Sequence, residues 1–325
     1  MKKTISLILC AVMLCSLVAL TGCAPTTLKF GSAVYVSGVS ATDATADKAG
    51  EGAINVTIAA VSVDANGKIV ACALDTAANT VGFGTDGKAV AATEAKTKGE
   101  MGDDYNMVAY GGAGKEWYAQ ADAFESVVAG KTLDEVKALV VDGYKAGDEL
   151  VNAGCTIAVS DFVGAVEKAY NNAVDSNVTT NDTLKVTAYT SQKNTDATAD
   201  AEGKCEVETY VFAAAVDADG KVVTADSDCV AATFTFTAAG KSTLDTTKAV
   251  QSKRELGDSY GMVAYGGAAN EWYAQADAFD SQCEGKTAAE IAGLIGEDGK
   301  GVEAVQTAGC TVYVTGFVKA ASKIG

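Results

Sequence analysis

The chain repeats itself over most of its length, and this repeat constrains the fold more than any other feature of the sequence. Residues 102–124 read GDDYNMVAYGGAGKEWYAQADAF and residues 257–279 read GDSYGMVAYGGAANEWYAQADAF, so 19 of these 23 positions agree at an offset of 155. Shorter matches extend the similarity in both directions: ATDATAD (41–47) with NTDATAD (194–200), DANGK (64–68) with DADGK (217–221), and AGCTI (153–157) with AGCTV (308–312). A period this long indicates a duplicated domain and not a solenoid repeat.

The repeat sets the expected domain boundaries. We expect a first domain at 33–174 and a second at 185–325, and a chain of 325 residues is long enough for two domains of ordinary size. The stretch between them, 175–184, is polar and rich in turn-forming residues, which is typical of a short linker.

Each predicted domain begins with strands. Residues 54–58 alternate between apolar and polar, and the pattern continues after an expected bulge at Ala59-Ala60. Asn66-Gly67 is a typical two-residue hairpin turn, and Asp219-Gly220 occupies the same place in the second domain. The sequence therefore predicts antiparallel strands in both domains.

The second part of each domain has a helical pattern. Apolar residues recur at i, i+4, i+7 and i+11 from Trp117 to Val128, which is the spacing of one helix face. A capping box opens the next helix at Thr132 and again at Thr287. Strands followed by helices predict an α+β fold, in which each of two tandem homologous domains is an antiparallel sheet with helices packed on one face.

The N-terminal residues predict export. Two lysines precede an apolar run from Ile5 to Leu20, and the run ends in Leu-Thr-Gly-Cys23, which resembles a bacterial lipobox. We therefore expect residues 1–22 to be a lipoprotein signal peptide, Cys23 to carry the lipid, and 23–32 to tether the protein to the extracytoplasmic face of the cell membrane. An ordinary secreted protein with a chance cysteine at this place is the alternative.

The composition excludes several kinds of chemistry. The chain has no histidine, which removes Ser-His and Cys-His nucleophile pairs and histidine-ligated metals. Its formal net charge of −17 repels phosphate backbones, so we expect no nucleic-acid partner. The carboxylates show no spacing typical of a general acid/base pair or a calcium loop, so we expect neither catalytic nor metal-binding residues.

Six cysteines remain after the predicted cleavage and lipidation: Cys72, Cys155, Cys205, Cys229, Cys283 and Cys310. An even number in an exported chain is compatible with disulfides. Around the predicted turn at Asp219-Gly220, however, Cys205 pairs with residue 234 and Cys229 with residue 210, so the two thiols lie out of register. We expect reduced, structural thiols, with a disulfide as the less favoured alternative.

An Ala-Gly-Cys-Thr element recurs at matching places in the two domains, just ahead of a helix-like pattern. It comprises Gly154, Cys155 and Thr156 in the first domain, and Gly309, Cys310 and Thr311 in the second. An acidic residue stands eight positions before each threonine, Asp148 in the first domain and Glu303 in the second. On the residues alone, the element is either a functional site or a duplicated turn-and-strand element of the core.

The strand–NGK–strand hairpin, the Glu-Trp-Tyr helix and the closing Ala-Gly-Cys-Thr segment together resemble the extracytosolic FMN-binding domain family. The tandem arrangement behind a lipobox is similar to the flavinylated lipoproteins of Gram-positive extracellular electron transfer. In that family a flavin transferase joins FMN through its phosphate to a threonine hydroxyl. The resemblance implies two covalent FMN groups, one on Thr156 and one on Thr311, with the adjoining Gly154, Cys155, Gly309 and Cys310 in the cofactor sites.

The same resemblance implies a function and its partners. The protein would be a redox carrier more than an enzyme with its own turnover. It would take electrons from membrane quinol-linked components fed by an NADH dehydrogenase and pass them to extracellular acceptors such as ferric iron or soluble flavins. Such a carrier needs no dedicated substrate pocket.

Two further hypotheses stay open at this point. The protein could be a surface lipoprotein that binds a ligand or partner without a redox cofactor, with the duplication adding avidity. The excised signal peptide could itself be a peptide signal, as in related lipoproteins. Among the recurring aromatic residues, we expect Trp117 to pack in the core, and the tyrosines are either core residues or partners of a flavin ring.

Overall fold

The computed structural model describes residues 26–91 and 95–325. The predicted signal peptide at 1–22 and the predicted lipid-bearing Cys23 lie outside the described residues.

The first repeat forms an antiparallel sheet. Its strands are β1 (Thr27–Tyr35), β2 (Val39–Thr42), β3 (Gly50–Val63), β4 (Ile69–Phe83) and β7 (Val174–Thr179). The long strand β3 pairs with β4 along one edge and with both β1 and β2 along the other, and β7 pairs with β1. The predicted hairpin turn between β3 and β4 is confirmed, because Gly67 takes the left-handed φ of 76° that such a turn requires.

The second repeat forms a three-stranded antiparallel sheet in the order β10-β9-β8. The strands are β8 (Thr183–Thr195), β9 (Gly203–Val216) and β10 (Val222–Phe236). The segment 175–184, which the sequence predicts as a linker, holds most of β7, a turn and the first residues of β8. The expected pairings of Cys205 with residue 234 and of Cys229 with residue 210 are confirmed, and all six described cysteines are free thiols.

Helices follow the strands in both repeats. In the first repeat they are α1 (Lys98–Met101), the 3-10 turn η1 (Gly102–Tyr105), α2 (Trp117–Val128), α3 (Leu133–Lys137), α4 (Asp148–Ala153) and α5 (Ser160–Asn171), with the short strands β5 (Val140–Val141) and β6 (Lys145–Ala146) between them. In the second they are α6 (Lys253–Leu256), η2 (Gly257–Tyr260), α7 (Trp272–Cys283), α8 (Ala288–Ile291), α9 (Glu303–Ala308) and α10 (Thr315–Ala321). The capping boxes at Thr132 and Thr287 are confirmed.

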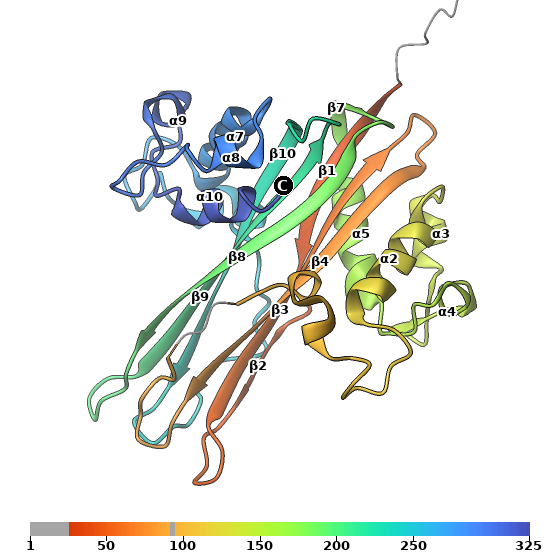
Figure 1. The fold of residues 1–325 in the computed structure, drawn as a ribbon. Coiled ribbons are helices and arrows are strands. Elements are labelled where there is room, and N and C mark those ends of the chain that lie inside the picture. The colour runs from red at the N-terminus through yellow and green to blue at the C-terminus, as the bar shows by residue number, and fades with distance from the viewer. Residues whose placement is uncertain (1–25, 92–94) are drawn as a thin grey trace, which may run out of the picture.

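The fold is α+β, with helices of each repeat on one face of that repeat's sheet (Figure 1). Helix α5 packs on β1 and β3, and α2 packs on β4. In the second repeat α10 packs on β8 and β9, and α7 packs on β10. The buried stripe expected on α2 is confirmed, since Trp117, Phe124 and Val128 are all at most 4% exposed.

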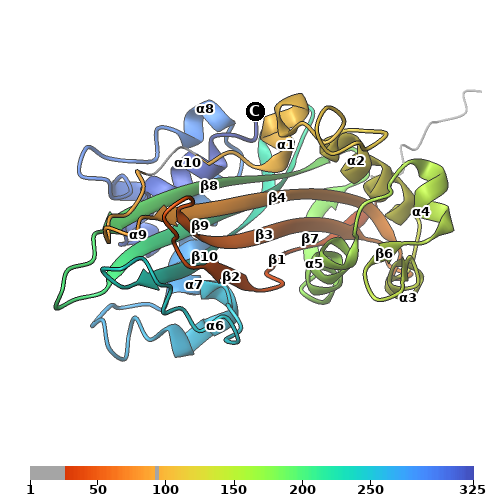
Figure 2. The same cartoon turned by 90° about the horizontal axis from the view of Figure 1, so that it is seen from below.

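The other faces of the two sheets pack against each other, which buries both faces of each sheet (Figure 2). On β3, Ala59, Val61 and Val63 face the helices, whereas Ile58 and Ala60 face the second sheet. The bulge expected at Ala59-Ala60 is therefore wrong. The strand runs through this place in register, and its continuous apolar run reflects burial on both sides.

The two repeats are related by an approximate two-fold arrangement. The equivalent residues Phe83 and Phe236 stack on each other, with ring centroids 4.5 Å apart and an interplanar angle of 3°. The same contacts recur in both directions: Ala44 N–H donates to Gly240 O and Ala197 N–H to Gly87 O, and ion pairs join Lys168 with Glu255 and Lys323 with Glu100. The recurring ATDATAD and NTDATAD segments thus each hold the other repeat.

Candidate functional site

The predicted acceptor threonines lie in equivalent exposed turns. Helix α4 ends at Gly154, which has a left-handed φ of 99°, and α9 ends at Gly309, where φ is 117°. A side chain at either place would be strained, so glycine allows the chain to turn sharply ahead of the threonine. Thr156 and Thr311 follow two residues later, and both are exposed.

A buried glutamine holds each threonine. Gln120 is fully buried on α2, and its Oε1 atom accepts from Thr156 N–H at 2.8 Å and from the Thr156 hydroxyl at 3.0 Å. Gln275 on α7 does the same for Thr311, at 2.9 and 3.1 Å. Because the threonine hydroxyl donates its hydrogen bond to the amide oxygen, the lone pairs of the threonine oxygen are left free to react.

Neither glutamine stands out from the sequence as a site residue. Gln120 and Gln275 both lie in the segment that agrees at 19 of 23 positions, within the shared run Tyr-Ala-Gln-Ala-Asp-Ala-Phe. Gln120 lies three residues after Trp117 and four before Phe124, which places it on the face of the apolar stripe, and a glutamine on the buried face of a helix needs a polar partner. That unexplained buried amide was the available signal.

The neighbouring cysteines are buried, in contrast to the exposed threonines. Cys155 and Cys310 have no exposed surface and belong to the two helix–sheet cores. Burial raises the pKa of the Cys155 thiol, and it raises that of Cys310 to about 11. Both are therefore neutral thiols at physiological pH and poor nucleophiles. Their predicted role in a cofactor site stays a prediction, and it could involve only their backbone atoms.

The side chain beside each glycine differs between the repeats. Lys115 Nζ lies 3.3 Å from the carbonyl oxygen of Ala153, and it covers Gly154 so closely that a Cβ atom there would lie 2.2 Å away. At the equivalent place in the second repeat, Asn270 Nδ2 donates to Gly309 O at 3.3 Å. The first site therefore has a positive charge at its rim that the second lacks.

A cavity of about 250 Å³ opens beside Thr156, in the first repeat. Its wall includes Ile157 and Ala158, which directly follow the threonine, and the aromatic side chains Tyr105, Trp117 and Phe162. Lys98 Nζ lies in this wall, 5.2 Å from the centre of the Tyr105 ring and 5.8 Å from that of Trp117. The cavity thus combines aromatic faces with the ammonium group of Lys98 and the carboxyl group of Asp161.

The backbone around Lys98 is fixed by a polar network. Thr97 forms the capping box of α1, and its hydroxyl also donates to the buried carboxylate of Asp75 at 2.5 Å. Gly99 N–H donates to the same carboxylate at 2.9 Å. These bonds hold the first turn of α1 against β4, so the cavity wall is positioned by the core of the sheet.

The same place in the second repeat is filled. Tyr210 stands where Thr57 lines the first cavity, and its ring packs on Phe317 with centroids 5.5 Å apart. Lys253, the equivalent of Lys98, is 5% exposed and forms an ion pair with Glu208 at 2.7 Å. Its Nζ atom lies within 5.7 Å of the centres of the Tyr210, Tyr260 and Trp272 rings. The second repeat thus places its own lysine among these aromatic rings.

The recurring tyrosines fall into two groups. Tyr105 lines the first cavity, whereas Tyr110 and Tyr265 are 88% and 92% exposed in the loops before α2 and α7. Ser160 and Thr315 are the first residues of the final helices α5 and α10. No side-chain cap is formed there, because Val159 and Val314 occupy the capping positions.

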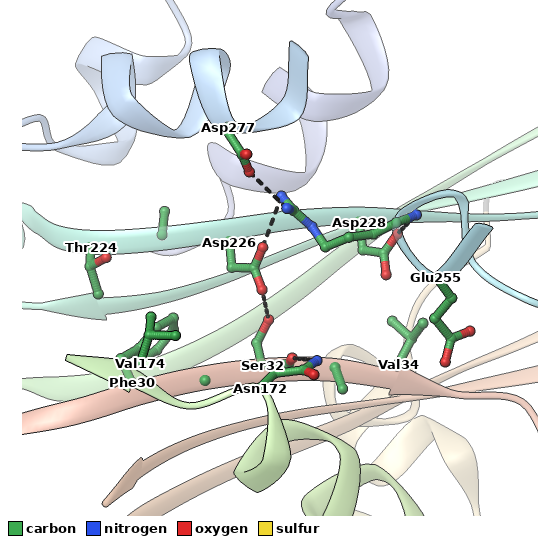
Figure 3. A pocket seen from close by; sticks show the side chains of 14 residues that line it. Phe30, Ser32, Val34, Asn172, Val174, Thr224, Asp226, Asp228, Glu255 and Asp277 are labelled. Atoms are coloured by element: carbon green, nitrogen blue, oxygen red, sulfur yellow. Dashed lines mark hydrogen bonds and ion pairs between the residues drawn. The ribbon is translucent and has the colours of Figure 1, made fainter. Parts of the chain in front are cut away.

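A second cavity, of about 470 Å³, lies on the seam between the repeats (Figure 3). Arg254 crosses it and binds Asp226 at 2.9 Å and Asp277 at 2.7 Å, and Ser32 of the first repeat donates to Asp226 at 2.7 Å. These charged groups satisfy one another. We therefore regard this polar network as part of the contact between the repeats.

Comparisons with known protein families, with curated proteins and with solved structures find no match to this chain. Within the described residues, no helix is long and apolar enough to cross a membrane. Over the same ranges, no cluster of three or more Cys, Asp or Glu side chains is arranged to hold a metal ion. The two threonine turns and their surroundings are therefore the features from which a function can be inferred.

Proposed function

We propose that the protein is a lipid-anchored electron carrier at the cell surface, with FMN joined through a phosphoester to Thr156 and to Thr311. The observation that carries the proposal is the geometry of the two turns. In each, a threonine hydroxyl is exposed, a buried glutamine orients it, and the adjoining thiol is turned into the core.

The residues present fit an attached flavin nucleotide. The left-handed glycine leaves the chain beside each hydroxyl without a side chain, so a transferring enzyme can approach it. At Thr156, the ammonium of Lys115 lies over the neighbouring glycine, where it would offset the negative charge of a phosphodiester. Gln120 and Gln275 would keep the backbone of each threonine fixed on a rigid helix, because each still accepts from the threonine N–H after the ester has formed.

The chain's own role is to hold and position the cofactor. The bound flavin supplies the redox chemistry, and the protein supplies attachment, orientation and charge. A flavin transferase using FAD would make the bond from threonine oxygen to phosphorus and release AMP. Membrane quinol-linked components fed by an NADH dehydrogenase are the proposed donors, and ferric iron or soluble flavins are the proposed acceptors.

The test is covalent mass. The full chain is expressed with a flavin transferase, solubilised in detergent, denatured and analysed by intact mass and absorbance. We expect two FMN groups on the unsubstituted chain, one on Thr156→Ala and one on Thr311→Ala, and none on the double variant. Ser160→Ala, another hydroxyl near the first turn, is the matched control and should retain both.

A colourless chain of unmodified mass would overturn the proposal. That result would favour the alternative of a surface lipoprotein that binds a ligand or partner without a redox cofactor.

A further inference from the structure

The strongest difference between the repeats lies beside the acceptor threonines. In the first repeat the space is a cavity of about 250 Å³, and in the second the equivalent space is occupied by side chains of the chain itself. Residues 102–124 and 257–279 agree at 19 of 23 positions, whereas the wall strands β3 and β9 differ at most positions, so the difference comes mainly from the strands and from the start of the final helix.

Seven of the twelve residues that line the first cavity are replaced in the second repeat, and three of these replacements bear directly on the space. Thr57 is replaced by Tyr210, whose ring fills the space against Phe317. Asp161 is replaced by Gly316, and a Cβ atom there would lie 2.3 Å from the Tyr210 ring, so the glycine is what makes room for the tyrosine. Asn55 is replaced by Glu208, which binds the lysine.

We propose that the first repeat binds a planar heteroaromatic ring of the isoalloxazine class in its cavity, and that Tyr210 closes the second repeat to such a ring. The inference rests on the proposed function in that the ring would be that of the FMN on Thr156. The two flavin sites are then unequal: the first ring would enter this cavity, whereas Thr311 borders a different and more open hollow of about 530 Å³ that lacks aromatic walls.

The size of the cavity favours a ring system over a whole nucleotide. Pockets for drug-sized ligands measure roughly 300–1,000 Å³, and this cavity has about 250 Å³. The ribityl and phosphate parts of an attached FMN would remain outside, towards Thr156. Because Ile157 and Ala158 belong to the wall, the threonine stands next to the opening.

The chemistry of the wall fits the ring. Trp117 and Tyr105 offer aromatic faces for stacking, and Lys98 offers a positive charge to the carbonyl edge of the ring. Among the described residues, no carboxylate lies within ion-pair distance of Lys98, whereas Glu208 neutralises Lys253. An ammonium beside the ring stabilises its anionic reduced form.

Helix α2 connects the cavity with the attachment point. Trp117 lines the cavity, and Gln120, one turn further along the same helix, holds Thr156. Movement of the ring against Trp117 is thus limited by the same element that fixes the tether.

The chain contains two tryptophans, one in each repeat, so each repeat can be observed separately. Full-length chain without attached flavin is titrated with riboflavin, which has no phosphate and cannot be joined to threonine. In the Trp272→Phe variant, riboflavin should quench the fluorescence of the remaining Trp117 in a saturable way. The Kd from this titration should be at least tenfold lower than the Kd from any quenching of Trp272 fluorescence in the Trp117→Phe variant. Equal quenching in the two variants would overturn the proposal.

A second set of variants exchanges the differing residues between the repeats and is titrated in the same way. Thr57→Tyr combined with Asp161→Gly reproduces the filled arrangement and should abolish saturable quenching of Trp117, while circular dichroism shows that the fold is kept. Tyr210→Thr should create saturable quenching of Trp272. If the double variant binds riboflavin as tightly as the parent, the cavity is not the binding site.

Flavin-loaded protein separates this inference from the proposed function. In the single-site variants, the FMN on Thr156 should be quenched by iodide at least threefold less than that on Thr311. Two covalent flavins with equal quenching would overturn the inference and leave the electron carrier in place. Saturable riboflavin binding in a chain that acquires no covalent FMN would support the cavity as a ring-binding site and overturn the proposed electron carrier.

Discussion

The two repeats have the same scaffold and differ where a ligand would lie. Both keep the glutamine, the left-handed glycine and the exposed threonine, and equivalent residues make reciprocal contacts between the repeats, as in the bonds from Ala44 to Gly240 and from Ala197 to Gly87. Beside the threonine, Thr57 leaves a cavity and Tyr210 fills it. Under the proposed function, attachment and enclosure of the cofactor depend on different residues, so a duplicated domain can keep the first and lose the second.

The largest expected effect concerns the two lysines. Lys253→Met leaves Glu208 without its partner and should lower the free energy of unfolding by about 2 kcal/mol, less than for a fully buried pair because Glu208 is 39% exposed. Lys98→Met removes a charge that has no ion pair among the described residues and should cost less than about 0.5 kcal/mol. Urea denaturation of both variants measures the difference. Equal losses would show that the lysines have the same role in the two repeats.

The glutamines test what the repeats share. Gln120→Leu removes the acceptor for the N–H and hydroxyl of Thr156, so it should cost about 1–2 kcal/mol of unfolding free energy and slow flavin attachment at Thr156 alone. Gln275→Leu should cost slightly more, because Gln275 also accepts from Val312 N–H at 3.1 Å. Urea denaturation and site-resolved mass spectrometry provide the two readings. An unchanged attachment rate in both variants would mean that the hydroxyl needs no orientation.

The smallest effect concerns a pair of buried carboxylates at equivalent places. Burial raises the pKa of Glu125 to about 7, although Leu74 N–H donates to it, and burial also raises that of Asp280 to about 7 against the attraction of Arg254. For Glu125 the unfolded chain ionises first, so stability falls as the pH rises from about 4.5 to about 7.

Glu125→Gln should therefore gain on the order of 1 kcal/mol at pH 8 and flatten the pH dependence in that window. Asp280→Asn is the contrasting variant, because it removes a partner 3.5 Å from Arg254 and should bring no gain. Thermal unfolding between pH 4 and pH 8 measures the change in stability of both variants. A loss of stability at pH 8 in Glu125→Gln would show that the ionised carboxylate contributes to the fold.

Much of the fold follows from local sequence. The turn at Asn66-Gly67 and the capping boxes at Thr132 and Thr287 depend on neighbouring residues only, and all three are as predicted. The bulge at Ala59-Ala60 was wrong because an apolar run in a strand has two explanations, an irregularity or burial on both faces, and the second requires knowledge of the other sheet.

The candidate site was predictable in part. The duplicated Ala-Gly-Cys-Thr element identified Thr156 and Thr311 as a matched pair, and the structure places both hydroxyls at the surface. The sequence element gave no indication of the glutamines that hold these threonines, because Gln120 is 36 positions away from Thr156 along the chain. The cavity was equally hidden, since its wall comes from strands β3 and β4, helices α1, α2 and α5, and the loops beside them.

By itself, the sequence determined that the chain is duplicated, that each half has strands before helices, and where each half turns at a glycine ahead of a threonine. These features depend on periodicity and on backbone preferences of adjacent residues. The tertiary structure alone decided that the two sheets cover each other, that a glutamine holds each threonine, and that one repeat is hollow where the other is filled. Those outcomes depend on side-chain volume and polarity at positions far apart in the chain, and a single exchange such as Thr57 for Tyr210 acts only when the opposite wall is in place.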